Sequence, residues 1–176
     1  MKDAIALAVP DPRWPAHYAA ARDEIVGVLP VPPLLIEHIG STAVPGLAAK
    51  PVIDIIVLVA DLASLEPALP DLMRLGYEFR PDVSNAERLF LRRFAPGGAR
   101  THHLHLHTDP QDVHRHLLFR DCLRADAATR TEYEALKRDL ARRHEGDRQA
   151  YASGKNDFID AVVRQAGGPE RRPFWA

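Results

Sequence analysis

The sequence predicts an α+β (mixed α/β) domain in which one central sheet is flanked by helices and followed by a helical C-terminal part. Three observations support this prediction. Apolar runs of strand length alternate with longer helical patterns in the first two thirds of the chain. Proline and glycine separate these segments, and the pattern becomes purely helical from Asp112 onward. This order, and a length of 176 residues, fit one domain built around one sheet.

The first helix is expected over residues 16–29, after a stiff extended segment at 11–15. Its apolar side chains fall roughly on one side, and Pro30 ends it because proline cannot continue a helix. Strands are expected at 34–39 and 52–59, since both are apolar runs bounded by turn residues.

A second helix is expected at 62–75, closed by Gly76, although Pro67 and Pro70 interrupt its pattern. Three further strands are expected at 77–80, 88–94 and 101–107, with the turn Pro96-Gly97-Gly98 joining the last two. Three helices are expected at 112–125, 128–144 and 155–166. The tail that follows is expected to be loose, with Phe174 and Trp175 as the side chains able to dock.

The composition excludes several classes of protein. A net charge of -1 gives no electrostatic basis for binding nucleic acid. A lone cysteine, Cys122, excludes an internal disulfide and a multi-cysteine zinc site. No apolar run reaches the ~18 residues of a membrane-spanning helix, and the first ten residues are too short and acidic for a signal peptide. We therefore expect a cytoplasmic protein with no membrane partner.

The most informative segment extends from His38 to Val57 and contains two apolar runs separated by a loop. Gly40 and Ser41 follow the first run, and Asp54 lies near the start of the second. Backbone N–H groups in such a turn can bind a phosphate, and the serine hydroxyl adds a donor. A carboxylate in a strand core is unfavourable unless it is paired, hydrogen-bonded or bound to a cation. The loop is therefore the expected site of a phosphorylated ligand, and a plain turn tied by Asp54 is the alternative.

Two more side chains of this loop are candidate phosphate ligands. Thr42 continues the Gly-Ser turn, and Lys50 precedes the second strand, where its ammonium group can reach a phosphate as a point charge. A solvated lysine is the alternative for Lys50. His38, on the strand that leads into the loop, fits a hydrogen-bonded core histidine slightly better than a functional group.

A second rich segment, HHLHLH at 102–107, places histidines at alternate positions. His103, His105 and His107 share one face of a strand, and the leucines between them face the core. The three histidines are therefore expected to face a cleft or solvent. Imidazoles two residues apart can bind one metal ion or act as general acids and bases near neutral pH. Asp54, His103 and His105 are thus the candidate catalytic and metal-binding residues, with a polar solvent face as the alternative.

Arg88 and Arg92 share a face of the preceding strand and are candidate phosphate-binding residues, because arginine can grip phosphate in a bidentate manner. A solvated strand face is the equal alternative. In the C-terminal helices, Lys137 fits a charged, solvent-exposed helix face. His114 and His116, two positions apart on a helix, are expected at the surface.

Together these segments resemble the GrpB family. The resemblance rests on DPRWP at 11–15, HIGSTAVPGLAAKPVIDIIV at 38–57, HHLHLH at 102–107, HLLFRDCLRAD at 116–126, EYEALKRDLA at 132–141 and KNDFI at 155–159. The family belongs to the nucleotidyltransferase superfamily, and some members are fused to dephospho-CoA kinase. The resemblance implies one domain, 1–176, comprising a nucleotidyltransferase-like core at 8–110, a helical extension at 111–166 and a tail at 167–176.

The resemblance also implies what the site has kept and lost. Nucleotidyltransferases carry a Gly-Ser or Gly-Gly signature, then two carboxylates on one strand, and a third acid on a later strand. These acids hold two Mg²⁺ ions that orient a nucleotide triphosphate. Here Gly40, Ser41 and Asp54 match, but Ile56 occupies the second acid position and residues 103–105 the third. This pattern is compatible with one divalent ion, Mg²⁺, Mn²⁺ or Zn²⁺, bound by Asp54 together with histidines. Mixed Asp/His ligands suit Mn²⁺ or Zn²⁺ better than Mg²⁺.

The leading hypothesis is a nucleotidyltransferase-like protein that binds a nucleotide or phosphorylated small molecule at an incomplete metal or catalytic site. Ile56 favours a non-catalytic ligand-binding module as the alternative. A histidine-triad nucleotide hydrolase also fits the pattern at 103–107. That motif continues with apolar residues, however, where this chain has Thr108 and Asp109. The sequence carries no signal for the oligomeric state.

Overall fold

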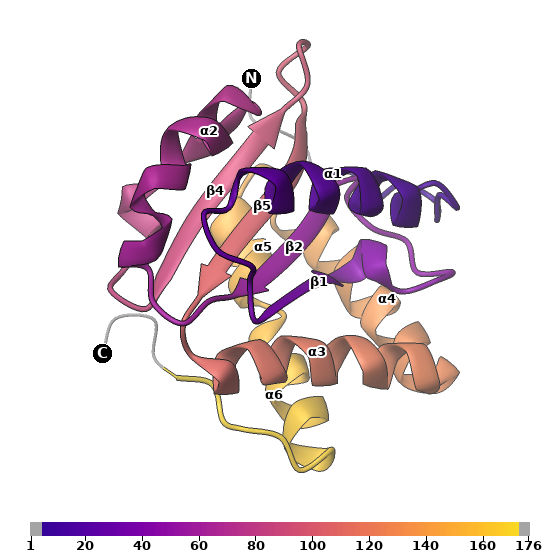
Figure 1. Ribbon diagram of the computed structural model, residues 1–176. Coiled ribbons are helices and arrows are strands. Elements are labelled where there is room, and N and C mark those ends of the chain that lie inside the picture. Colours follow the sequence, from indigo (N-terminus) through magenta and orange to yellow (C-terminus); the bar gives the residue numbers. More distant parts are fainter. Residues whose placement is uncertain (1–4, 173–176) are drawn as a thin grey trace.

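The structure, a computed structural model that describes residues 5–172, has a central five-stranded sheet with helices on both faces (Figure 1). The strands are β1 (Leu35–Ile39), β2 (Ile53–Leu58), β3 (Tyr77–Phe79), β4 (Arg88–Phe94) and β5 (Arg100–His107). Their order across the sheet is β1-β2-β5-β4-β3. β2 and β5 run parallel, and the other neighbours are antiparallel. The sheet is therefore mixed, and the predicted fold class is confirmed.

Six α-helices accompany the sheet. They are α1 (Trp14–Val28), α2 (Leu69–Arg74), α3 (Pro110–Ala125), α4 (Ala127–Arg143), α5 (Arg148–Ser153) and α6 (Asn156–Gln165). The last four follow β5 without interruption by a strand, and Figure 1 shows α3 and α6 side by side below the sheet. None of the helices in the described part of the chain is long and apolar enough to cross a membrane.

Each face of the sheet buries its own apolar cluster. On one face, alternate side chains of β2 and β5 pack against α1 and α2, and Ile55 and Leu104 are fully buried there. On the other face, α3 packs through Val113 against Ile39 and Ile56. Side chains alternate between the two faces of a strand, so the residues between the buried leucines of β5 must lie on the α3 face.

The register of the sheet decides which polar residues meet on that face. Asp54 lies opposite His103, and Ile56 lies opposite His105. On the far side of β5, Arg92 lies opposite His103. The parallel pairing thus brings the acid of the first half of the chain beside the histidine strand.

Local chemistry explains where the predicted elements shift. α1 begins at Trp14 instead of residue 16, because Pro15 is well accommodated in the first turn of a helix. The helix predicted at 62–75 is divided, since Pro67 ends up inside a 3₁₀ helix and α2 begins only at Leu69.

Three of the C-terminal helices, α3, α4 and α5, begin at aspartates that cap them. Asp109 accepts a hydrogen bond from the Gln111 amide at the start of α3, and Asp126 accepts one from Ala128 at the start of α4, both at 2.9 Å. Asp147 caps α5 in the same way, a short helix that the periodicity did not predict. The predicted docking residues of the tail, Phe174 and Trp175, lie outside the described residues.

We expect Leu91→Ala in β4 to lower the free energy of unfolding by ~2–5 kcal/mol, because it opens a cavity in a fully buried cluster. Leu34→Ala is the matched control. Leu34 is 68% exposed, so its truncation is expected to change stability by less than ~0.5 kcal/mol. Urea denaturation of the two variants measures the difference, and equal midpoints would contradict this assignment of the core.

Candidate functional site

The Gly40-Ser41 turn lies directly against Asp54. Gly40 has a φ of 71°, a backbone conformation that glycine adopts more readily than other residues. A Cβ atom at this position would lie 2.5 Å from Asp54 Oδ2. Gly40 therefore serves two needs, since it permits the turn into the short 3₁₀ helix Ser41–Ala43 and leaves room for the carboxylate.

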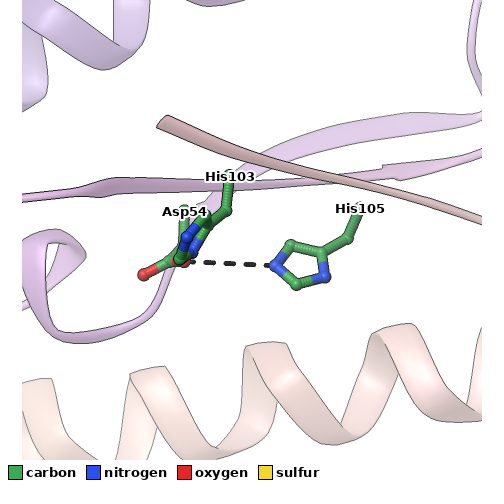
Figure 2. A group of neighbouring side chains, drawn as sticks. All are labelled: Asp54, His103 and His105. Atoms are coloured by element: carbon green, nitrogen blue, oxygen red, sulfur yellow. Dashed lines mark hydrogen bonds and ion pairs between the residues drawn. The ribbon is translucent and has the colours of Figure 1, made fainter. Parts of the chain in front are cut away.

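Asp54, His103 and His105 form a compact group of potential metal ligands. One donor atom from each residue lies within 4.8 Å of the others. Figure 2 shows the two imidazoles on the same side of the strands as Asp54, with His103 almost touching the carboxylate. The distances from Asp54 Oδ1 are 2.8 Å to His103 Nδ1 and 4.0 Å to His105 Nε2. The structure thus brings together the three residues that the sequence indicated.

The hydrogen bonds of His103 define its tautomer. Its Nδ1–H donates to Asp54, so Nε2 carries the lone pair in the neutral ring. That Nε2 accepts a long hydrogen bond, 3.4 Å, from the Arg100 guanidinium. An imidazole held by a carboxylate at one nitrogen, with a lone pair at the other, can act as a general base.

Burial and charge act in opposite directions on the Asp54 carboxyl group. Burial favours its neutral form, but hydrogen bonding to His103 and His105 outweighs burial and lowers the pKa of Asp54. Burial also lowers the pKa of His105 to about 4, although Asp54 opposes this shift. Asp54 is therefore ionised and His105 neutral at pH 7, which are the states in which both can bind a metal ion.

A buried histidine holds the beginning of the loop. His38 is only 5% exposed, and its Nε2 lies 2.9 Å from Thr42 Oγ1. Thr42 uses its own proton on the Val52 carbonyl, so it must accept from His38. Burial lowers the pKa of His38 to about 4. The interpretation of His38 as a hydrogen-bonded core histidine agrees with these contacts.

A buried lysine from α4 holds the rest of the loop. Lys137 is 2% exposed, and its Nζ donates to Ser41 Oγ at 3.1 Å and to the Ala48 carbonyl. The Ala48 amide in turn donates to Glu134 of α4 at 3.0 Å. The helix and the loop are thereby fixed to each other on both sides of Ala48.

The loop, the sheet and the C-terminal helices enclose a cavity of about 250 Å³. Its lining includes Ser41, Asp54 and His103. Positively charged side chains outnumber negatively charged ones in this lining. Asp54 is the one carboxylate among the described lining residues, whereas five lining residues are cationic. The cations are Lys50, Arg100, Lys137, Arg148 and Lys155. Three of the four lysines in the whole chain therefore converge on this one cavity.

The lysines are close enough to repel one another. Burial and the positive charges of Lys155, Arg148 and Arg100 lower the pKa of Lys50 to about 8. Burial lowers the pKa of Lys137 to about 7, and the pKa of Lys155 is lowered as well. The ammonium groups of Lys50 and Lys155 lie 4.1 Å and 4.7 Å from the centre of the Tyr151 ring, which stabilises them partly. Such a cluster favours binding of an anion.

The two arginines predicted to bind phosphate lie elsewhere. Arg92 shares a row with His103, but its guanidinium pairs with Glu78 of β3 at 2.7 Å. Arg88 lies four residues before Arg92 in the strand and lines a second cavity, together with His107. Arg88 and Arg92 do share one face of β4, as predicted. Side chains along one face of a strand can, however, lie too far apart to line the same cavity.

Two predictions about exposure were wrong, those for His116 and Lys137. His105 and His107, which were expected to face a cleft or solvent, pack against α3, and His107 lines a cavity there. Their rings lie 6.3 Å and 6.2 Å from the ring of His116, which the sequence placed at the surface. Lys137, expected on a charged helix face, is buried against the loop. Sequence periodicity alone does not show which helix face a distant loop covers.

Sequence reasoning also missed the cations at Arg100 and Lys155 as site residues. Arg100 opens β5 just before the histidines, so its place at the start of that strand was the available signal. Arg148 is the first residue of the unpredicted helix α5 and Lys155 follows that helix, and both line the cavity where α5 packs against α4.

Comparison with known proteins identifies relatives along the whole chain. The profile of a family described as GrpB protein matches residues 4–165. UPF0157 protein PA4798 of Pseudomonas aeruginosa is 40% identical over 174 residues, covering 98% of this chain and 72% of that protein. UPF0157 protein SCO7215 of Streptomyces coelicolor is 42% identical over 168 residues, covering 95% and 87%. A dephospho-CoA kinase of Mycolicibacterium paratuberculosis is 31% identical over 92% of this chain but only 46% of its own length.

Two solved structures share the fold. Conserved protein GrpB from Enterococcus faecalis matches with a TM-score of 0.81 and 34% identity, covering 92% of this chain and 96% of that chain. Cid1 poly(U) polymerase, solved with Mg 3′-dATP bound, matches with a TM-score of 0.56 and 17% identity. That match covers 78% of this chain and 44% of the polymerase chain. At this identity it concerns the fold alone, which is nucleotidyltransferase-like.

The close approach of Gly40 to Asp54 can be tested with a pair of glycine variants. Gly40→Ala and Gly46→Ala both place alanine at positive φ, but a Cβ atom at Gly46 has no neighbour within 4 Å. We expect Gly40→Ala to be less stable than Gly46→Ala by ~1–3 kcal/mol, because the new methyl group displaces the Asp54 carboxylate. Urea denaturation measures the difference. Imidazole NMR shows whether His103 keeps its bond to Asp54, and an unchanged His103 signal in Gly40→Ala would contradict the clash.

Proposed function

The chain belongs to the GrpB family, and we propose that it binds a nucleotide or another phosphorylated small molecule in the cavity beside Gly40 and Ser41. The observation that carries the proposal is the charge of this cavity, in which five cationic side chains accompany one carboxylate. Lysines with lowered pKa values gain stabilisation when an anion binds beside them. A phosphate chain supplies that charge in a shape that the cavity accommodates.

The charge balance differs from that of a two-metal site. Three carboxylates and two divalent ions would bind a triphosphate through the metal. Here Ile56 is apolar and fully buried, and His103 lies opposite Asp54 on the neighbouring strand. The lysines and arginines can neutralise the phosphates directly, so binding of the phosphate chain does not require a metal ion.

Individual contacts follow from the observed hydrogen bonds. Lys137 uses two donors on Ser41 and Ala48, which leaves its third N–H for a phosphate oxygen. Lys50 and Lys155 line the same cavity, each with its ammonium group near the Tyr151 ring. The Thr42 hydroxyl donates its hydrogen bond to the Val52 carbonyl, so we propose that Thr42 stabilises the loop and does not bind the phosphate.

Asp54 and His103 are the groups available for chemistry. With His105 they fit a single divalent ion, Mg²⁺, Mn²⁺ or Zn²⁺, and the imidazole nitrogens favour Mn²⁺ or Zn²⁺ over Mg²⁺. Such an ion would supply Lewis-acid chemistry at the phosphate. Without it, we propose that His103 Nε2 takes a proton from an attacking hydroxyl group after its long hydrogen bond from Arg100 is broken. Phosphoryl or nucleotidyl transfer is the reaction class that these groups support.

A second candidate function is a binding module without catalysis. The burial of Ile56 at the position of the second acid favours it, because no metal pair can form there. The two functions differ in what Asp54 does. A catalytic site needs its carboxylate, whereas a simple phosphate pocket binds its anion more tightly once this negative charge is removed.

We expect ATP, CTP, GTP, UTP or pyrophosphate to raise the melting temperature of the wild type, and Lys50→Met to weaken that binding about 10- to 100-fold. The expected loss corresponds to one charged hydrogen bond of ~1.5–3 kcal/mol. Isothermal titration calorimetry, with EDTA and then with Mg²⁺, Mn²⁺ or Zn²⁺, gives the dissociation constants. Arg142→Met, on an exposed part of α4, is the matched control and should bind as the wild type does.

Asp54→Asn then separates the two functions. If the site is catalytic, this variant loses metal-dependent binding and any turnover of the nucleotide. If the site is a binding module, the variant binds pyrophosphate at least as tightly as the wild type in EDTA. Equal response of the wild type, Lys50→Met and Arg142→Met to every phosphate ligand would contradict the proposed site.

Binding is also expected to depend on pH. Lys50 and Lys137 have pKa values lowered to about 8 and about 7, so both lose their charge as the pH rises from 6.5 to 9. Affinity for pyrophosphate should therefore fall over this range, and binding at pH 8 should take up protons. Lys50→Arg keeps a charge at every pH of this range and should flatten the profile. A wild-type affinity that stays constant from pH 6.5 to 9 would contradict this role for the lysines.

A further inference from the structure

We propose that His105, His107 and His116 form a second metal site, for a transition ion such as Zn²⁺, between β5 and α3. The site is distinct from the cavity beside Gly40 and Ser41, although it shares His105 with the Asp54 group. A neutral imidazole has one lone pair, so when His105 Nδ1 serves this site, Asp54 and His103 alone hold the other ion. Its ligands would be three imidazoles, a donor set that favours Zn²⁺, Co²⁺ or Cu²⁺ over Mg²⁺ or Ca²⁺.

The first argument is the state of the two strand histidines. His107 is 2% exposed, and its Nδ1 lies 3.0 Å from Asp112 Oδ2. His105 presents its Nε2 to Asp54, while its other ring nitrogen points away from the carboxylate in Figure 2. In each ring the carboxylate favours the proton on the nearer nitrogen, which leaves a lone pair on the other. Carboxylates hold metal-binding histidines in this way in many proteins.

The second argument is that both lone-pair nitrogens are buried and unsatisfied. Among the residues that the structure describes, no hydrogen-bond partner is found for His105 Nδ1 or His107 Nε2. Burying a polar atom without a partner is unfavourable, so such atoms in a folded protein call for an explanation. A metal ion satisfies both at once.

The third argument is the arrangement of the three rings. The centres of His105 and His107 lie 6.3 Å apart, those of His105 and His116 also 6.3 Å, and those of His107 and His116 6.2 Å. The rings thus form a nearly equilateral triangle. With zinc–nitrogen bonds of ~2.0–2.1 Å, three rings around one ion have centres ~5–5.5 Å apart. Among the described residues, the one group of three potential metal ligands with donor atoms within 4.8 Å of one another is Asp54, His103 and His105. Binding here therefore requires the rings of the three-histidine group to close in by about 1 Å.

An ion has a path to this position. His107 and His116 both line a second cavity of about 360 Å³. Two arginines of its rim are already ion-paired, Arg115 with Asp160 and Arg172 with Asp109. A fourth ligand, such as water, can occupy the cavity side of the ion, the open position typical of zinc sites with three histidines.

Metal stoichiometry tests the proposal. The wild type and its variants are equilibrated with Zn²⁺ or Co²⁺, freed of unbound ion and measured by elemental analysis, with visible absorption for Co²⁺. His116→Asn should bind one equivalent less than the wild type and lose the absorption of the three-histidine site. His114→Asn is the matched control, because His114 lies on the same helix and is exposed. His103→Asn should lose ions only at the Asp54 group.

Imidazole NMR of the wild type provides a measurement that needs no variant. On addition of Zn²⁺, the nitrogen signals of His107 and His116 should shift together. Stoichiometry and absorption that are the same in His116→Asn as in the wild type would overturn the proposal, as would histidine signals that do not move. Loss of ions in His103→Asn alone would leave the Asp54 group intact as a metal site while rejecting this one.

Discussion

The parallel pairing of β2 with β5 sets Asp54 opposite His103, and the rest of the site is arranged around that pair. Residues about 50 positions apart in the chain meet here only because the two strands share this register. A shift of one residue would turn Asp54 to the face covered by α1 and α2 and bury a carboxylate in an apolar cluster. The close approach of Gly40 depends on the same register, since it fits the turn around the carboxylate.

The loss of acids and the gathering of cations at this site are related consequences of electrostatics. In a two-metal site, carboxylates hold the ions and the ions hold the phosphates. This cavity has one carboxylate among its described lining residues, Asp54, so positive charge for a phosphate has to come from its cationic side chains. Burial, and after it the positive charges of neighbouring side chains, lowers the pKa of Lys50 and of Lys137, so their charged forms are unfavourable without an anion. A bound phosphate chain would stabilise these charged forms, which is why we treat the lysine cluster as the strongest indication of a ligand.

The sequence was sufficient for the strands and for the Asp54, His103 and His105 group, because strand periodicity and turn residues are local signals. It was insufficient for Lys137, His116 and Arg148, whose surroundings depend on how helices pack. Lys137 has the pattern of an exposed helix residue, and only the loop that folds over α4 buries it. The same reason explains Arg88 and Arg92, which were placed on the correct face but are held away from the phosphate cavity by their partners on neighbouring elements.

The alternation of histidine and leucine in β5 places His103, His105 and His107 on one face of the strand. Their surroundings differ because of the position of α3. His103 lines the cavity beside Ser41 and Asp54. His105 and His107 lie beneath the helix, where solvent cannot satisfy their ring nitrogens and the chain itself supplies carboxylates for only one nitrogen of each. A simple solvent-facing strand needs no such carboxylates. Asp54 and Asp112 therefore indicate that the buried histidines are held in place for a ligand at their remaining nitrogens.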